Sequence, residues 1–125
     1  MRLFHSADLR EINVWYASRG EYGLTATAVP ETGLIEPHIA CGFLYRTDAP
    51  AIAMLDSFVS NPEAPLRARA TSLREIAQRL MELAEVGGVT HIMALCKSRG
   101  ISRLADRMGL KPIGFYALAG KELGS

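Results

Sequence analysis

The feature that most constrains the fold is a long amphipathic pattern followed at once by an apolar segment. Over residues 72–86, apolar side chains recur at helical spacing and charged side chains occupy the opposite face, which predicts a helix packed on a core. Ser72 and Glu75 have the spacing of a capping box and predict the start of this helix, and the glycine pair at 87–88 predicts its end. The segment 89–96 is short and apolar, which predicts a strand buried on both faces.

Shorter elements fill the rest of the chain. Local patterns predict strands at 2–4, 39–45, 52–59 and 113–119, with 39–45 and 52–59 paired as a hairpin, and helices at 9–18 and 99–108. The helix 72–86 is expected to bury Leu73, Ile76, Leu80 and Leu83. Asp8 and Ser98 are the predicted N-caps of the two shorter helices. Residues 24–36 fit either one interrupted strand or a turn between two short strands. The expected fold is α/β or α+β: one domain over 1–125, with a mixed central sheet and helices on both faces.

Composition narrows the classes of function. Hydrophobic residues make up 49% and charged residues 22%, so a folded domain is expected and disorder is not. The formal net charge of +1 does not favour a nucleic-acid partner. No apolar run reaches the roughly 18–20 residues of a membrane span, and the N-terminus turns polar too early for a signal peptide. Cys41 and Cys96 lie in apolar surroundings and are expected to be buried thiols of a cytoplasmic protein, and the three scattered histidines predict no metal site.

The segment before the amphipathic helix is the first candidate binding site. It joins the strand 52–59 to the helix and contains Arg67 and Arg69 among alanines. The free N–H groups of a helix N-terminus, its positive dipole end and two guanidinium groups suit a phosphate or pyrophosphate. The alternative is a solvated loop without a ligand, because the segment contains no glycine.

Taken in order, these elements resemble the GCN5-related N-acetyltransferase superfamily over nearly the whole chain. The segments similar to that family are the opening strand and helix cap at 2–9, the fourth strand with its closing proline at 55–62, the fifth strand at 89–96 and the following helix at 98–110. The family's pyrophosphate loop is matched most closely by residues 67–72. The resemblance implies a sheet that is splayed between its fourth and fifth strands.

The resemblance also implies acetyl-coenzyme A as cosubstrate and an amine of a small molecule or protein as acceptor. The implied coenzyme-binding residues are Phe58, Val59, Arg67, Ala68, Arg69, Ala70, Thr71, Ser72 and Ser98. Acyl transfer to an amine further requires a base that accepts the amine proton and a hydrogen-bond donor for the oxyanion, and a proton donor assists the leaving thiolate. The backbone N–H beside Val59 is the implied oxyanion donor.

Two side chains are candidates for the proton transfers. Asp56 is the candidate base, and strand alternation would place it on the same face as Met54 and Phe58. The alternative for Asp56 is a hydrogen-bonded strand residue without chemistry. Tyr116, in the last predicted strand, is a candidate acid for the thiolate, with core packing as its alternative. His91, in the predicted fifth strand, is another possible base, but a histidine in an apolar strand is more often a core residue, and that is the expectation.

Departures from the family pattern support a second hypothesis. The family's usual tyrosine, which protonates the coenzyme thiolate, falls on Ala105, and its usual asparagine falls on Ser98. The chain therefore fits either an acyl-coenzyme A-dependent N-acyltransferase or a non-catalytic binding or interaction module on the same scaffold. The shortened C-terminal region also predicts that 113–119 is an apolar edge strand, which favours a homodimer over a monomer protected by its flanking lysines.

Overall fold

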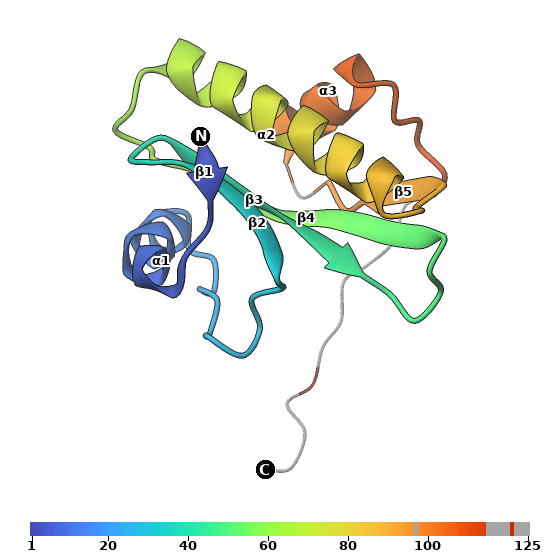
Figure 1. Ribbon diagram of the computed structural model, residues 1–125. Coiled ribbons are helices and arrows are strands. Elements are labelled where there is room, and N and C mark those ends of the chain that lie inside the picture. The colour runs from blue at the N-terminus through green and yellow to red at the C-terminus, as the bar shows by residue number, and fades with distance from the viewer. Residues whose placement is uncertain (97, 115–120, 122–125) are drawn as a thin grey trace.

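The computed structural model describes residues 1–96, 98–114 and 121, in an α+β fold (Figure 1). In chain order its elements are β1 (Arg2–Leu3), the 3₁₀ turn η1 (Ser6–Asp8), α1 (Leu9–Ala17), β2 (Thr32–Glu36), β3 (Ala40–Arg46), β4 (Ile52–Ser60), α2 (Leu66–Val86), β5 (His91–Ala94) and α3 (Arg99–Arg107). The predicted α+β class with a mixed sheet is confirmed for this part of the chain.

The five strands form one open sheet in the order β1-β2-β3-β4-β5. The pairs β1–β2, β2–β3 and β3–β4 are antiparallel, which confirms the predicted hairpin of β3 and β4. β4 and β5 are parallel, with Ile52 opposite His91 and Leu55 opposite Ala94. Parallel neighbours need a crossover connection, and α2 supplies it across one face of the sheet.

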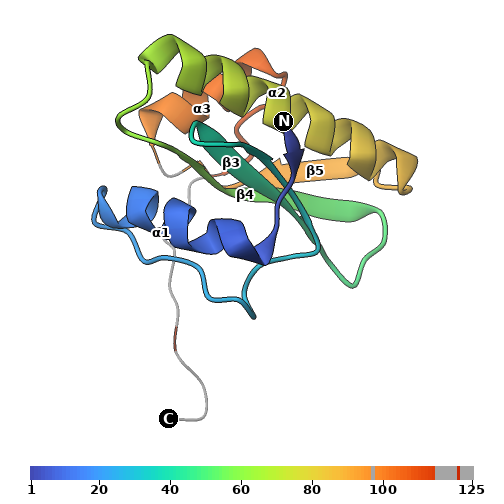
Figure 2. The same ribbon diagram turned by 60° about the vertical axis from the view of Figure 1, so that its left-hand side comes forward.

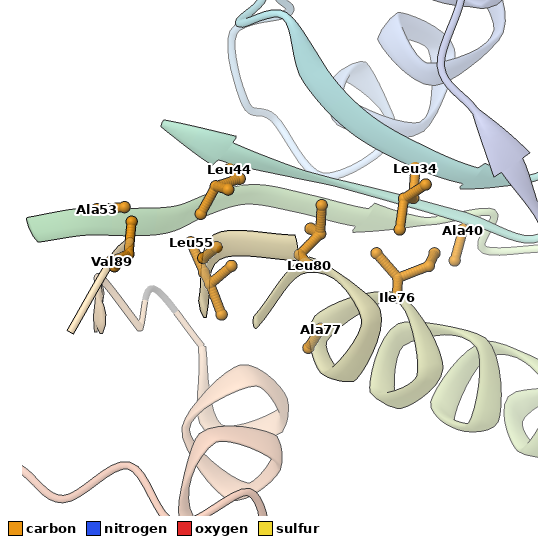
Figure 3. Packing of buried hydrophobic residues seen from close by; sticks show 10 residues of the cluster. Leu34, Ala40, Leu44, Ala53, Leu55, Ile76, Ala77, Leu80 and Val89 are labelled. Atoms are coloured by element: carbon orange, nitrogen blue, oxygen red, sulfur yellow. The ribbon is translucent and has the colours of Figure 1, made fainter. Parts of the chain in front are cut away.

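The helices α1 and α2 lie on opposite faces of the sheet (Figure 2), and a cluster of buried residues packs beneath each of them. On one face, Ile76 and Leu80 of α2 point toward Leu34, Leu44 and Leu55 of the strands (Figure 3). On the other face, α1 contributes Ile12, Trp15 and Tyr16, which pack against residues that include Ile35, Cys41, Phe43 and Val59. The sequence prediction that α2 buries Ile76 and Leu80 is confirmed, and Leu73 and Leu83 are half-buried beside them.

The helix α2 starts well before the predicted capping box. Pro65 has extended backbone angles, and its carbonyl accepts the first helical hydrogen bond from the Arg69 N–H at 3.0 Å. From Leu66 onward the chain contains alanines, arginines and leucines, which are strong helix formers, so nothing delays the helix until Ser72. Ser72 lies buried inside α2, and the prediction that it begins the helix is wrong.

Among the described residues, a packed layer covers only one face of the strand β5. His91 and Met93 are exposed, whereas Ile92 and Ala94 are half-buried and pack against the cluster under α2. The prediction of a strand buried on both faces, with His91 in the core, is therefore wrong. A continuous apolar run cannot show by itself whether a second layer covers it.

The helix α3 follows the predicted boundaries closely. Ser98 is its N-cap, with Oγ accepting a hydrogen bond from the Ile101 N–H at 3.2 Å, and Gly109 ends the helix region in a left-handed conformation, φ 86°. Beyond it, Ile113 and Gly114 have no regular structure, and residues 115–119 of the predicted last strand lie outside the described residues.

The ambiguous segment 24–36 contains one strand, β2, at its C-terminal end. No helix of the described residues combines the length and the apolar character that a bilayer crossing demands.

Candidate functional site

The first feature of the candidate site is an unequal pair of parallel strands. The pairing of β4 with β5 ends where Leu55 meets Ala94, but β4 continues to Ser60. The far half of β4, from Asp56 to Ser60, therefore has no β5 partner among the residues that the structure describes. The carboxyl end of a parallel strand at the edge of such a gap is a common place for a ligand in α/β sheets.

The second feature is a β-bulge in the same part of β4. Cys41 pairs with Val59 and Phe43 pairs with Asp56, so one extra residue of β4 lies opposite this stretch of β3. Ser57 has φ 59°, in the left-handed region that residues other than glycine rarely adopt. Bulges of this kind change the direction of side chains and are frequent beside functional sites.

Two tyrosines hold the bulge. The Tyr16 hydroxyl donates to the Ser57 carbonyl oxygen, and the Tyr45 hydroxyl is hydrogen-bonded to Ser57 Oγ at 2.9 Å. The Ser57 N–H donates to Asp56 Oδ1 at 2.7 Å. Burial raises the pKa of both tyrosines, so they keep their protons at neutral pH and can donate.

The bulge corrects the predicted arrangement of Asp56. Asp56 lies directly opposite Phe43, and cross-strand partners share a face, so Asp56 is on the α1 side of the sheet. Phe58 instead packs against the cluster beneath α2, on the other side, where its ring lies over Gly42. Asp56 and Phe58 are therefore on opposite faces, because the extra residue breaks the strict alternation that the prediction assumed. Val59 is buried on the α1 side.

The third feature is the N-terminus of α2, which follows β4 after a short connection. The first-turn N–H groups of Leu66, Arg67 and Ala68 have no acceptor within the helix, and no side chain caps them. Arg67 is exposed, whereas the half-buried Arg69 donates from Nε to the Ala64 carbonyl at 3.0 Å. Arg69 thus braces the connection that leads into the helix.

The predicted pyrophosphate segment is helical rather than a loop. All of the residues assigned to it, Arg67, Ala68, Arg69, Ala70, Thr71 and Ser72, lie within the first turns of α2. Only the earliest of them offer free N–H groups, since later ones bond within the helix. The expectation of a loop over these positions is wrong, because Pro65 rather than Ser72 marks the helix boundary.

The remaining predicted positions are spread over the C-terminal part of the chain. Ser98 caps α3, where its Oγ accepts a hydrogen bond from the Ile101 N–H. Ala105 is half-buried in α3. Tyr116, the candidate acid, lies outside the described residues.

The two cysteines differ from each other. Cys41 is buried under α1, and burial raises the pKa of its thiol to about 12, so it is an inert core residue. Cys96 is exposed, which contradicts the prediction that both are buried. The described residues contain no cluster of side chains suited to a metal ion.

A separate hollow lies at the opposite end of α2. It has a volume of about 490 Å³ and is lined by residues that include Met81, Ala84, Val89 and Ile92. It contains none of the predicted site residues. The candidate site is therefore defined by strand geometry and hydrogen bonding, at the end of α2 where β4 leads into the helix.

Sequence reasoning missed Tyr16, Tyr45 and Ser57 as members of the site. Tyr16 lies in the helix predicted at 9–18, and Tyr45 and Ser57 lie in the predicted strands 39–45 and 52–59, but no local pattern marks any of the three as a site residue. Comparison of the chain with family models, curated proteins and solved structures gives no significant match. The resemblance to the N-acetyltransferases thus rests on the chain's own residues and on its order of elements.

Proposed function

We propose that this chain is an acyl-coenzyme A-dependent N-acyltransferase, which transfers an acetyl group from acetyl-coenzyme A to an amine in a ternary complex. The observation that carries the proposal is the end of the β4–β5 pairing at Leu55 and Ala94. Beyond it, β4 has no strand partner on its β5 side among the described residues, and the strand leads into the uncapped N-terminus of α2. A strand edge and a helix N-terminus in succession suit a ligand with an amide-containing arm and a pyrophosphate.

The residues present fit such a coenzyme. The pyrophosphate would be held by the free N–H groups of Leu66, Arg67 and Ala68 with the exposed Arg67 guanidinium, and the small side chains of Ala68 and Ala70 leave the approach open. The arm would lie against β4 near Phe58 and Val59. A sheet splayed between β4 and β5, as in the N-acetyltransferases, is part of this proposal.

The coenzyme supplies the activated acyl group as a thioester, and the chain's residues position the amine and accept its proton. Asp56 is the proposed base. Its Oδ1 accepts the Ser57 N–H, which orients the carboxylate, and no partner of Oδ2 is found among the described residues. An oriented carboxylate with one oxygen available can accept the proton that the amine loses when it attacks the thioester carbonyl.

Calorimetry with acetyl-coenzyme A tests the proposal. We expect binding by the native chain and roughly tenfold to hundredfold weaker binding by Arg67→Ala, since a charge-assisted contact contributes about 1.5–3 kcal/mol. Arg74→Ala is the matched control, because it removes an exposed arginine of the same helix about 10 Å further along the axis. Absence of binding at millimolar coenzyme would contradict the proposal.

The second candidate function is a non-catalytic module on the same scaffold that binds or interacts without transferring a group. Ala105, at the position of the family's usual tyrosine, favours it. Release of free thiol from acetyl-coenzyme A across a panel of amines distinguishes the two. Coenzyme binding without thiol release for any amine would support the module, whereas amine-dependent release would support the enzyme.

A further inference from the structure

The bulge at Ser57 is a strained place in an otherwise regular strand. Among the described residues, only His38 and Ser57 are non-glycine residues with positive φ, and His38 lies in an exposed turn. A conformation of this kind is strained and persists only where the surroundings enforce it. Ser57 lies two residues beyond Leu55, where β4 and β5 part.

The enforcing contacts come from two different elements, both of which precede Ser57 in the chain. Tyr16 reaches it from α1, and Tyr45 reaches it from β3. Neither hydroxyl is needed for the proposed chemistry, and each tyrosine ring packs against the core under α1. We call Tyr16 and Tyr45, with Ser57 between them, the tyrosine clamp.

The tyrosine clamp affects the orientation of the Asp56 carboxylate. In a regular ladder, the N–H of a strand residue points toward a neighbouring strand. At the bulge, the Ser57 N–H donates to the carboxylate of the preceding residue instead. The position of the Ser57 backbone therefore sets the orientation of the Asp56 carboxylate.

We propose that Tyr16 and Tyr45 are positioning residues, which hold the Ser57 bulge and thereby aim the Asp56 carboxylate at the amine. This inference rests on the proposed function. A base in this role must lie within hydrogen-bond distance of the proton that it removes, and a displacement near 1 Å can cost about a hundredfold in rate.

Steady-state kinetics of Tyr16→Phe, Tyr45→Phe and the double variant test the positioning role. We expect kcat of the double variant to fall by about tenfold to a hundredfold, with the KM for acetyl-coenzyme A changed by less than about threefold. Tyr22→Phe is the matched control, because that tyrosine is 98% exposed and should leave both constants unchanged. In an Asp56→Asn background, the tyrosine substitutions should have no additional effect on kcat, because they act through Asp56.

Two results would overturn the inference. An equal loss of kcat in the native and Asp56→Asn backgrounds would show that the tyrosines do not act through Asp56. An unchanged kcat in the double variant would show that the clamp has no role in the reaction. If the double variant does not fold, Ser57→Ala serves in its place. It removes the hydroxyl that is bonded to Tyr45, keeps the carbonyl that is bonded to Tyr16, and should also lower kcat.

Amide hydrogen exchange at Ser57 tests the tyrosine clamp independently of any catalytic activity. Loss of the clamp should accelerate exchange of the Ser57 N–H in the tyrosine variants and leave it unchanged in Tyr22→Phe. Unchanged exchange would overturn the clamp whatever the chain catalyses. A native chain that binds no acetyl-coenzyme A, with Ser57 exchange that still depends on the tyrosines, would instead overturn the proposed function and the positioning role, and leave the clamp as a structural device.

Discussion

At the scale of single residues, one surface carboxylate joins the first strand to the first helix. Asp8 accepts two hydrogen bonds from the Arg2 guanidinium, at 2.7 and 2.8 Å, and a third from the His5 N–H. The sequence predicts Asp8 as the N-cap of α1, but the carboxylate makes no cap bond to that helix and instead closes the preceding turn η1. The bond from Arg2 is the main reason that the pKa of Asp8 lies below its ordinary value.

A lowered folded-state pKa fixes the direction of the pH effect. The stabilisation by Asp8 is present above its ordinary pKa and is lost as the pH falls through the folded-state value. At pH 7 we expect Asp8→Asn to lower the free energy of unfolding by up to about 1 kcal/mol, as for a good surface ion pair. Urea denaturation at pH 7 and near pH 2 checks this, because the difference should shrink at the lower pH. A difference independent of pH, or an equal loss in the exposed Asp48→Asn, would contradict it.

At the scale of elements, α2 shows which parts of a helix follow from local pattern. Its apolar stripe and its end at the glycine pair agree with the sequence, because both depend on neighbours within a few residues. Its start does not agree, since two local signals compete. The capping-box spacing at Ser72 would begin the helix there, but the preceding residues extend it back to Pro65.

The two positions considered for Ser72, at the N-cap or inside the helix, predict different effects of Ser72→Ala on the free energy of unfolding. If Ser72 were an N-cap, Ser72→Ala would cost about 1 kcal/mol. Inside the helix, we expect the substitution to be neutral or to stabilise by up to about 0.5 kcal/mol, because alanine has the higher helix propensity. Thermal and urea unfolding measure this change in the free energy of unfolding. A Ser72→Ala loss near 1 kcal/mol would instead place the start of the helix at the capping box.

Leu80→Ala tests the packing of α2 on the sheet. The substitution should lower the free energy of unfolding by roughly 2–5 kcal/mol, because Leu80 is fully buried between α2 and the sheet. The same unfolding experiments measure it.

At the scale of the whole molecule, the C-terminal part of the described chain exposes large apolar side chains. Met93 and Leu95 are partly exposed there, and Ile113 is 78% exposed. The described residues provide no strand that pairs with the outer edge of β5. An apolar edge that no described strand pairs with favours association with a second copy, which we propose as a homodimer.

Light scattering over a range of concentrations tests the homodimer. We expect a mass near twice 13.6 kDa, and a shift toward the single-chain mass in Ile113→Lys, because a buried charge would oppose association. Tyr22→Lys, at an exposed position of the opposite half of the chain, is the control and should leave the mass unchanged. A mass that stays near 13.6 kDa at every concentration would exclude the dimer.

The sequence by itself determined those features that depend on residues close together in the chain. The α2 stripe, the β3–β4 hairpin, the Ser98 cap and the left-handed Gly109 all follow from local spacing or from the conformational freedom of one residue. The resemblance to the N-acetyltransferases pointed to Asp56, but only through the position of its strand.

The tertiary structure alone decided how those elements meet. The bulge at Ser57 depends on the register of β4 against β3 and on a hydroxyl from α1, so no pattern within β4 could reveal it. The faces of Asp56 and Phe58 depend on that bulge, and the exposure of His91 depends on what covers β5. Periodicity reports which residues share a side of one element, but burial, strain and site geometry arise from contacts between elements that are far apart in the chain.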